Sequence, residues 1–241
     1  MSHAKLAYLS LALLFILNQC NEPKKNKSKK KNTTEQIQPA TQDSIEEKSK
    51  IKQETEKKEI LLNDQNAIPF FFNYEKENPE NKVRISTRFG TIDIELYEDT
   101  PYHRANFIYL TKKGYFNGST FHRVVPGFII QGGNSDRALT AEKRRKIGKY
   151  LLPPDTRKGH KHHRGVISMP SSEIENPHKL ASPYEFFIVQ QDPGAYHLDG
   201  SYTAFGKVIR GMEIVDQINR QKIDKREAPL SNIHMDVSII E

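Results

Sequence analysis

The segment 121–133, Phe-His-Arg-Val-Val-Pro-Gly-Phe-Ile-Ile-Gln-Gly-Gly, contains the residue types in this chain that most suggest chemistry. It places a permanent cation, Arg123, an aromatic ring, Phe128, and an amide, Gln131, around a Pro-Gly turn. No Ser-His-Asp pattern, cysteine nucleophile or pair of carboxylates accompanies them in the sequence. A cation, an amide and an apolar wall without a nucleophile favour rotation about a bond over cleavage of one.

Apolar and polar residues alternate with the period of a β-strand at residues 83–87 and 90–96. The Arg-Phe-Gly turn between these segments predicts a hairpin. A helix is expected next, with Thr100 as its N-cap, a proline in its first turn and Gly114 as its end. A second helix is expected at residues 212–219.

More strands are expected from similar runs, at residues 120–125, 127–131, 165–169, 185–190, 203–208 and 236–240. Many short strands with only two helices predict a mainly β fold, a closed eight-stranded antiparallel β-barrel capped by two α-helices. The segment 134–164 is long, polar and basic. A stretch of that length in a small domain is usually functional or ordered by the barrel.

The chain has 241 residues, of which 36% are hydrophobic, and a net charge of +7. Apolar residues concentrate in residues 81–241, which we interpret as one compact domain. Residues 21–80 are rich in Lys, Glu, Gln, Asn, Ser and Thr, and they are predicted to be a charged, largely disordered tether. Its one apolar patch, residues 68–74, either packs on the edge of the domain or extends the first strand.

The lysine-rich run at residues 24–31 contributes much of the positive charge. Such a run can bind nucleic acid or anionic lipid. Charge blocks are more often solvated and flexible, so we interpret this one as tether and expect no nucleic-acid partner. A functional role for the lysines, with the compact domain as a scaffold, is the weaker alternative.

Residues 1–20 are predicted to be a signal peptide. The apolar run at residues 6–17 is shorter than the about 20 residues that span a bilayer, but it suits a signal-peptide core. It closes at Cys20, the only cysteine, and resembles a bacterial lipoprotein signal, although Gln19 replaces the usual small residue. The resemblance implies lipidation of Cys20 and anchoring in the cell envelope, on the periplasmic or extracytoplasmic face of a membrane. An uncleaved anchor and ordinary secretion are the alternatives.

The segment 121–133 reproduces, almost unbroken, the signature of the cyclophilins, a family of peptidyl-prolyl cis–trans isomerases that residues 82–241 resemble as a whole. Other blocks follow in the family's order: Asn106-Phe107, Gly165-Val166-Ile167-Ser168-Met169, Glu185-Phe186-Phe187-Ile188-Val189, Leu198-Asp199-Gly200, Ala204-Phe205-Gly206-Lys207-Val208 and Gly211-Met212-Glu213. The resemblance implies isomerisation of X-Pro peptide bonds without a cofactor.

The resemblance assigns the chemistry to Arg123 and Gln131. Resonance gives the X-Pro bond double-bond character and a rotation barrier of about 18–20 kcal/mol. A guanidinium that points at the prolyl nitrogen localises its lone pair, and Arg123 stays charged at any relevant pH. Gln131 is expected to hold the guanidinium and to bond to the peptide backbone. Phe128, Ile129, Phe187 and Leu198 are expected to line a proline pocket that excludes water.

Four further substrate-binding positions depart from the usual family pattern. Glu185 replaces a glutamine, and its carboxylate is expected to form an ion pair with Arg123 that either locks the guanidinium or competes for the prolyl site. Ser171, preceded by a proline, replaces an asparagine that contacts the substrate backbone. His197 replaces a tryptophan, which implies weak binding of cyclosporin-type inhibitors, and Tyr202 replaces a histidine.

The histidine-rich run at residues 160–163 invites a metal interpretation, because imidazole is a common ligand. No carboxylate or thiolate partners stand nearby at a set spacing, so we interpret the run as a solvated loop and expect no metal site. The basic run at residues 143–146 is also interpreted as solvated, and it would bias the site toward acidic client peptides.

Two functions follow from these observations. The first is a monomeric, membrane-tethered isomerase that assists the folding of exported proteins, with proline-containing peptides and unfolded chains as its partners. The second is a catalytically impaired proline-peptide binding or chaperone module, which Glu185 and Ser171 favour. The presence of Arg123 favours the first.

Overall fold

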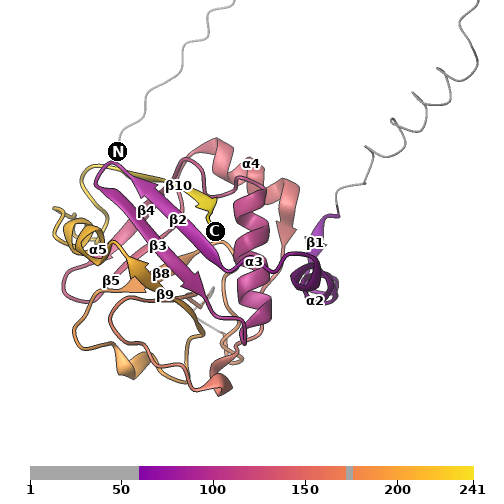
Figure 1. Ribbon diagram of the computed structural model, residues 1–241. Coiled ribbons are helices and arrows are strands. Elements are labelled where there is room, and N and C mark those ends of the chain that lie inside the picture. Colours follow the sequence, from indigo (N-terminus) through magenta and orange to yellow (C-terminus); the bar gives the residue numbers. More distant parts are fainter. Residues whose placement is uncertain (1–59, 172–175) are drawn as a thin grey trace, which may run out of the picture. The chain divides into compact units, whose positions relative to one another are not determined.

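The computed structural model describes residues 60–171 and 176–241 (Figure 1). The predicted signal peptide, Cys20 and the predicted tether up to residue 59 lie outside the described residues. Eight strands close into an antiparallel barrel in the order β10-β2-β3-β9-β7-β8-β5-β4, which confirms the predicted barrel. They are β2 (Lys82–Thr87), β3 (Gly90–Leu96), β4 (Ser119–Val125), β5 (Ile129–Asn134), β7 (Val166–Ser168), β8 (Phe186–Val189), β9 (Ala204–Arg210) and β10 (Ile233–Ile239).

Alternation along the strands divides their apolar side chains between two clusters, one on each face of the sheet. The larger cluster fills the barrel, and its members on β4, β5 and β8 are Phe121, Val124, Ile130, Phe186 and Ile188. The smaller cluster is built mainly from the alternate residues of β5, β7, β8 and β9, and it therefore lies on the outside of the barrel. Its buried members are Ile129, Val166, Phe187, Val189, Ala195 and Ala204.

A β-bulge interrupts β4 where this strand pairs with β5. Arg123 pairs with Gln131, whereas His122 is an extra residue without a partner on β5. Phe121 and Val124 both belong to the barrel core although they are three positions apart, which regular alternation does not allow. The bulge thereby leaves two neighbouring side chains, those of His122 and Arg123, on the outer face.

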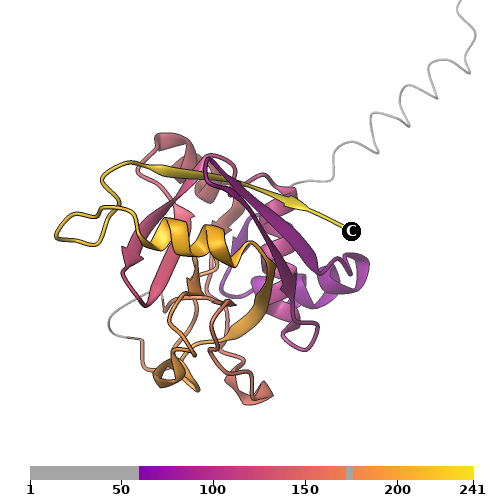
Figure 2. The same cartoon turned by 60° about the vertical axis from the view of Figure 1, so that its left-hand side comes forward.

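Within the described residues four α-helices accompany the barrel, two more than predicted. The predicted pair, α3 (Pro101–Lys112) and α5 (Met212–Asn219), lie on opposite sides of the strands (Figure 1), and α5 contacts β3, β4 and β5 (Figure 2). Gly114 follows α3 with a φ of +60°, in agreement with its predicted role. Thr100 does not cap α3 with its side chain, because its Oγ1 donates to the backbone oxygen of Tyr97 at 3.2 Å.

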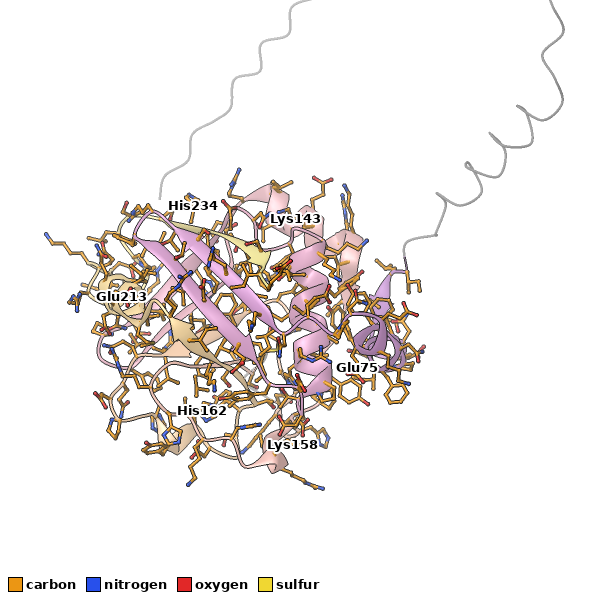
Figure 3. All side chains as sticks on the ribbon, viewed as in Figure 1. Glu75, Lys143, Lys158, His162, Glu213 and His234 are labelled. Atoms are coloured by element: carbon orange, nitrogen blue, oxygen red, sulfur yellow. The ribbon has the colours of Figure 1, made fainter. Side chains whose placement is uncertain are left out.

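An unpredicted helix, α4 (Ala138–Ile147), lies within the long polar segment 134–164. This helix buries little apolar surface, so its sequence lacks the helical periodicity of apolar residues that would have predicted it. The prediction that its basic residues are all solvated was wrong. Lys143 Nζ donates to the backbone oxygens of Gly114 and Asn117 at 2.6 and 2.9 Å (Figure 3). These carbonyls follow the C-terminal end of α3, where a cation is favourable.

The apolar patch of the predicted tether forms helix α2 (Ala67–Glu77). The rings of Phe70, Phe71 and Tyr74 pack against Tyr109 of α3 with centroid distances of 5.1, 5.8 and 5.3 Å. The patch therefore packs on the domain edge as a helix and does not extend the first strand. Residues 60–80 belong to the folded unit, which corrects the predicted boundary at residue 81. Among the described residues, none of the helices combines the length and the apolar character needed to cross a membrane.

A short parallel pair joins the start of the folded unit to the end of α4. It consists of β1 (Leu62–Asn63) and β6 (Gly148–Lys149). Gly148 has a φ of +135°, and a Cβ at this position would lie 1.9 Å from the backbone oxygen of Leu62. Only glycine fits here without movement of β1.

Gly148→Ala is expected to lower the free energy of unfolding by about 2 kcal/mol, because β1 must move away to admit the methyl group. Urea unfolding followed by circular dichroism measures the change. Gly200→Ala is the matched control, since Gly200 also has a positive φ, +71°, but no atom lies within 4 Å of its Cβ position. An equal loss in both variants would show that backbone strain, and not the contact with β1, sets the cost.

Candidate active site

The smaller apolar cluster has a partly exposed rim on the outside of the barrel. Phe128, Leu198 and Tyr202 are partly buried and pack against the cluster that contains Ile129 and Phe187. All of these residues are predicted from the sequence to bind substrate, and the structure brings them together. Their contact with a proline ring stays a prediction.

Aromatic contacts define the shape of this apolar surface. Phe187 is 3% exposed and forms the floor, and the ring of Tyr202 meets it edge-on at 5.9 Å. Phe128 stands at the rim, where its ring stacks on His197 at 5.3 Å with an interplanar angle of 28°. His197 thus occupies the predicted position beside the apolar surface, with its side chain exposed.

Arg123, Gln131 and Phe187 occupy directly paired positions on β4, β5 and β8. Paired residues on adjacent strands point to the same face, so the three side chains form a row across the outer surface. Nη1 of Arg123 donates to Oε1 of Gln131 at 3.3 Å. The row places a permanent cation beside an apolar surface, with an amide between them.

A residue that the sequence analysis missed, Glu227, also contacts the arginine. Its Oε2 accepts a hydrogen bond from Nε of Arg123 at 2.8 Å and lies 2.8 Å from Nη2 in an ion pair. Glu227 lies in the loop between α5 and β10, within the run Asp-Lys-Arg-Glu, which is typical of a solvated loop. Nothing in that local sequence indicates a partner on β4.

Glu185 does not form the predicted ion pair with Arg123, which is made by Glu227 instead. Glu185 accepts from Nε2 of Gln131 at 3.0 Å, and it lies 3.5 Å from Nε2 of His122 and 3.7 Å from Nη2 of Arg144. Burial alone would raise the pKa of Glu185, but the neighbouring imidazole, amide and guanidinium hold it below its usual value. The charged carboxylate takes the Gln131 amide N–H, so Oε1 of that amide faces the arginine.

Ser171 lies apart from this row. Its Oγ accepts from Nδ2 of Asn176 at 3.0 Å, and its backbone forms an isolated bridge with Ala181. Both contacts belong to the loop that contains the undescribed residues 172–175. The predicted contact between Ser171 and a substrate backbone stays a prediction.

The prediction that residues 160–163 form a solvated loop holds for Lys161 and His163, which are exposed, but not for His162. His162 is buried, and its ring lies parallel to that of Phe187 at 6.2 Å (Figure 3). His160 stacks on Tyr97 at 4.1 Å, and Nδ1 of His163 lies 2.9 Å from the hydroxyl of Tyr196. Within residues 60–171 and 176–241, no group of three or more metal-ligating side chains is arranged to hold an ion.

The fold also assembles a Ser-His-Asp set that the sequence did not reveal. Nδ1 of His162 lies 2.8 Å from Oδ1 of Asp199, and Nε2 lies 3.1 Å from Oγ of Ser168. The Ser168 hydroxyl is buried and donates to the backbone oxygen of Thr203 at 2.7 Å. A nucleophile needs access to substrate, so this set supports the floor of the apolar surface and does not cleave bonds.

Comparison with known proteins identifies the family. The model described as cyclophilin type peptidyl-prolyl cis-trans isomerase/CLD matches residues 82–238. A peptidyl-prolyl cis-trans isomerase of Acinetobacter baylyi is 35% identical over 140 residues, which cover 56% of this chain and 70% of that protein. The isomerase CYP18-1 of Arabidopsis thaliana is 34% identical over 155 residues, which cover 64% of this chain and 91% of that protein.

Two more similar proteins extend the comparison. The isomerase-like 2 protein of Rhizopus delemar is 36% identical over 160 residues, but the match spans only 28% of its length. A crystal structure of a cyclophilin type isomerase from Cryptosporidium parvum matches with a TM-score of 0.57 and 30% identity, over 67% of this chain and 98% of that one. The barrel, the row of paired residues and these similarities agree, and the chain belongs to the cyclophilin-type peptidyl-prolyl cis–trans isomerases.

Proposed function

We propose that this peptidyl-prolyl isomerase uses Arg123 to weaken the amide resonance of X-Pro bonds, and that its clients are exported proteins. One observation carries the mechanism: Arg123, Gln131 and Phe187 form a single row, so a guanidinium stands next to an apolar surface that suits a proline ring. A crystal structure of the Cryptosporidium parvum isomerase in the presence of the dipeptide Ala-Pro matches this chain with a TM-score of 0.56 and 30% identity.

The catalytic step needs no covalent intermediate. The proline ring packs on Phe128 and Phe187, and an N–H of Arg123 hydrogen-bonds to the prolyl nitrogen as the bond twists. The twisted nitrogen carries a localised lone pair, so this hydrogen bond is stronger in the transition state than in the planar ground state. Stabilising the twisted state by about 7 kcal/mol gives roughly a 10⁵-fold acceleration.

The apolar surroundings strengthen this interaction. Water that would screen the guanidinium is displaced when a proline ring covers the rim formed by Phe128 and Leu198, so the charge acts through a weaker dielectric. Gln131 holds one nitrogen of the arginine and is available to the peptide backbone. Slow uncatalysed isomerisation, tens to hundreds of seconds at about 25 °C, gives such a catalyst a role in folding.

The decisive experiment measures the rate of cis–trans exchange of X-Pro peptides with the full chain and with Arg123→Ala. The wild type should accelerate the exchange and the variant should lose most of that acceleration.

A second function, a proline-peptide binding module with weak catalysis, is favoured by one observation: Glu227 already pairs with the Arg123 guanidinium. Wild-type exchange at the background rate, together with retained peptide binding, would support that module and contradict the enzyme mechanism.

We also propose that the isomerase is a monomer anchored to a membrane of the cell envelope through Cys20. The support is the apolar run at residues 6–17 followed by this cysteine. Cys20→Ser is expected to abolish incorporation of a labelled fatty acid and to release the protein from the membrane fraction. Ser28→Ala, a change beyond the predicted lipidation site, is the control. Membrane retention of the Cys20→Ser variant would indicate an uncleaved anchor instead.

A further inference from the structure

We infer that Glu227 is a positioning residue that orients the Arg123 guanidinium for catalysis. The inference rests on the proposed function, because it requires that Arg123 acts on the substrate. Oε2 of Glu227 accepts the Nε–H at 2.8 Å and lies 2.8 Å from Nη2 in an ion pair, and Oε1 of Gln131 accepts one N–H of Nη1. The guanidinium is therefore held from two directions, and each terminal nitrogen keeps at least one N–H for the substrate.

The loop that carries Glu227 is held in place by hydrogen bonds to the side chain and the backbone of Asp224 and to β4. Oδ1 of Asp224 accepts from the N–H groups of Arg226 and Ala228 at 2.8 and 2.9 Å, and the N–H of Glu227 donates to the backbone oxygen of Asp224 at 3.1 Å. The backbone oxygen of Glu227 accepts from the N–H of Val124 on β4 at 2.8 Å. The loop is thus closed on itself and attached to the strand that carries the arginine.

The backbone conformation of Glu227 is unusual. Its φ is +63°, in the left-handed region that residues with a Cβ disfavour. Such conformations persist where the surrounding structure enforces them, and they cluster at functional sites. The two backbone hydrogen bonds of Glu227 itself, to Asp224 and from Val124, and the ion pair enforce this one, and the conformation directs the carboxylate at the arginine.

Stability alone does not explain the ion pair. The side chains of Arg123 and Glu227 are 41% and 37% exposed, and exposed pairs contribute little to stability. Because both backbones are fixed, the ion pair instead sets the orientation of the guanidinium. A hydrogen bond to the prolyl nitrogen requires the guanidinium at a defined position. Gln131 holds a single nitrogen at 3.3 Å and leaves the plane of the group free to turn. Glu227 fixes that plane.

The test compares Glu227→Gly, Glu227→Gln and the wild-type full chain by NMR exchange measurements on an X-Pro peptide. Glycine suits a φ of +63°, so Glu227→Gly removes the carboxylate without adding backbone strain. We expect kcat to fall about tenfold with KM within about twofold, because misplacement of a catalytic group acts on turnover. Glutamine keeps an acceptor oxygen and is expected to restore most of the loss.

A spectroscopic readout separates positioning from a purely structural role. The Nε–H resonance of Arg123 should exchange slowly with water in the wild type and in Glu227→Gln, and rapidly in Glu227→Gly. Lys225→Ala, an exposed change in the same loop, is the control and should behave like the wild type.

Two outcomes contradict the inference in distinguishable ways. Unchanged or increased kcat in Glu227→Gly, alongside an inactive Arg123→Ala, would overturn the role of Glu227 alone and show it to be a bystander or an inhibitory counter-ion. A wild-type protein without activity would overturn the proposed function and the inference together.

Discussion

Arg123→Ala is expected to lower kcat/KM for X-Pro isomerisation by about 10²–10³-fold, the range measured when one preorganised transition-state donor is removed from other enzymes. The other two members of the row, Gln131 and Phe187, carry no charge, so neither can replace the guanidinium at the prolyl nitrogen. NMR exchange or a protease-coupled assay on a series of X-Pro peptides measures the loss. Peptide binding should persist, since the apolar surface is unchanged.

Two further variants sharpen this test. Arg145→Ala removes an exposed arginine of α4 and should retain wild-type activity. Arg123→Lys keeps a positive charge but lacks the planar fork that bonds Gln131 and Glu227 at once, so most activity should be lost. Wild-type turnover in Arg123→Ala would remove this residue from the chemistry.

The largest expected effect of pH on stability comes from His103. This residue of α3 is fully buried, and within the described part of the chain neither ring nitrogen has a hydrogen-bond partner. Burial lowers the pKa of His103 from 6.5 to about 3, because a charged imidazolium cannot be solvated there. The folded protein therefore holds a neutral imidazole in its core.

The sign of the effect follows from proton uptake. Below pH 6.5 the unfolded chain protonates His103, whereas the folded chain stays neutral until about pH 3. The free energy of unfolding consequently decreases as pH falls through this window, by up to about 1.4 kcal/mol per pH unit. Above pH 6.5 this loss is absent.

His103→Leu is expected to remove that slope and to raise stability at every acidic pH, since it also replaces a buried polar group that lacks partners. Urea unfolding at a series of pH values between about 7 and 4 gives the comparison. His234→Leu, an exposed change on β10, should leave the wild-type profile intact. Parallel profiles for the wild type and His103→Leu would contradict the assignment.

Local periodicity was sufficient to predict most of the barrel. The alternation in β2 and β3 and the amphipathic run of α5 reflect contacts that each element makes along one face, so the sequence of the element alone reveals them. Helix α2 could not be predicted in this way. Its apolar patch has no helical period, and its structure depends on packing against Tyr109, a residue of another helix.

In the candidate site, too, contacts between residues close in the sequence could be predicted and contacts between distant residues could not. Arg123 and Gln131 are eight positions apart on paired strands, so their proximity follows from a hairpin. Glu227 is 104 positions from the arginine, in a run of charges that resembles any solvated loop. The buried ring of His162 has its partner 37 positions away, because its Nδ1 lies 2.8 Å from Oδ1 of Asp199. Contacts between residues so far apart in the sequence form only when the barrel closes, so no local sequence pattern predicts them.

The bulge in β4 gives this strand one residue more than the alternation of its side chains requires. Deletion of His122 would leave Phe121 facing the barrel interior and would make Arg123 its direct neighbour, still on the outer face opposite Gln131. The change would remove only the imidazole that lies 3.5 Å from Glu185. Evolution along this strand is therefore free to lose the extra residue without turning the arginine away from the apolar surface.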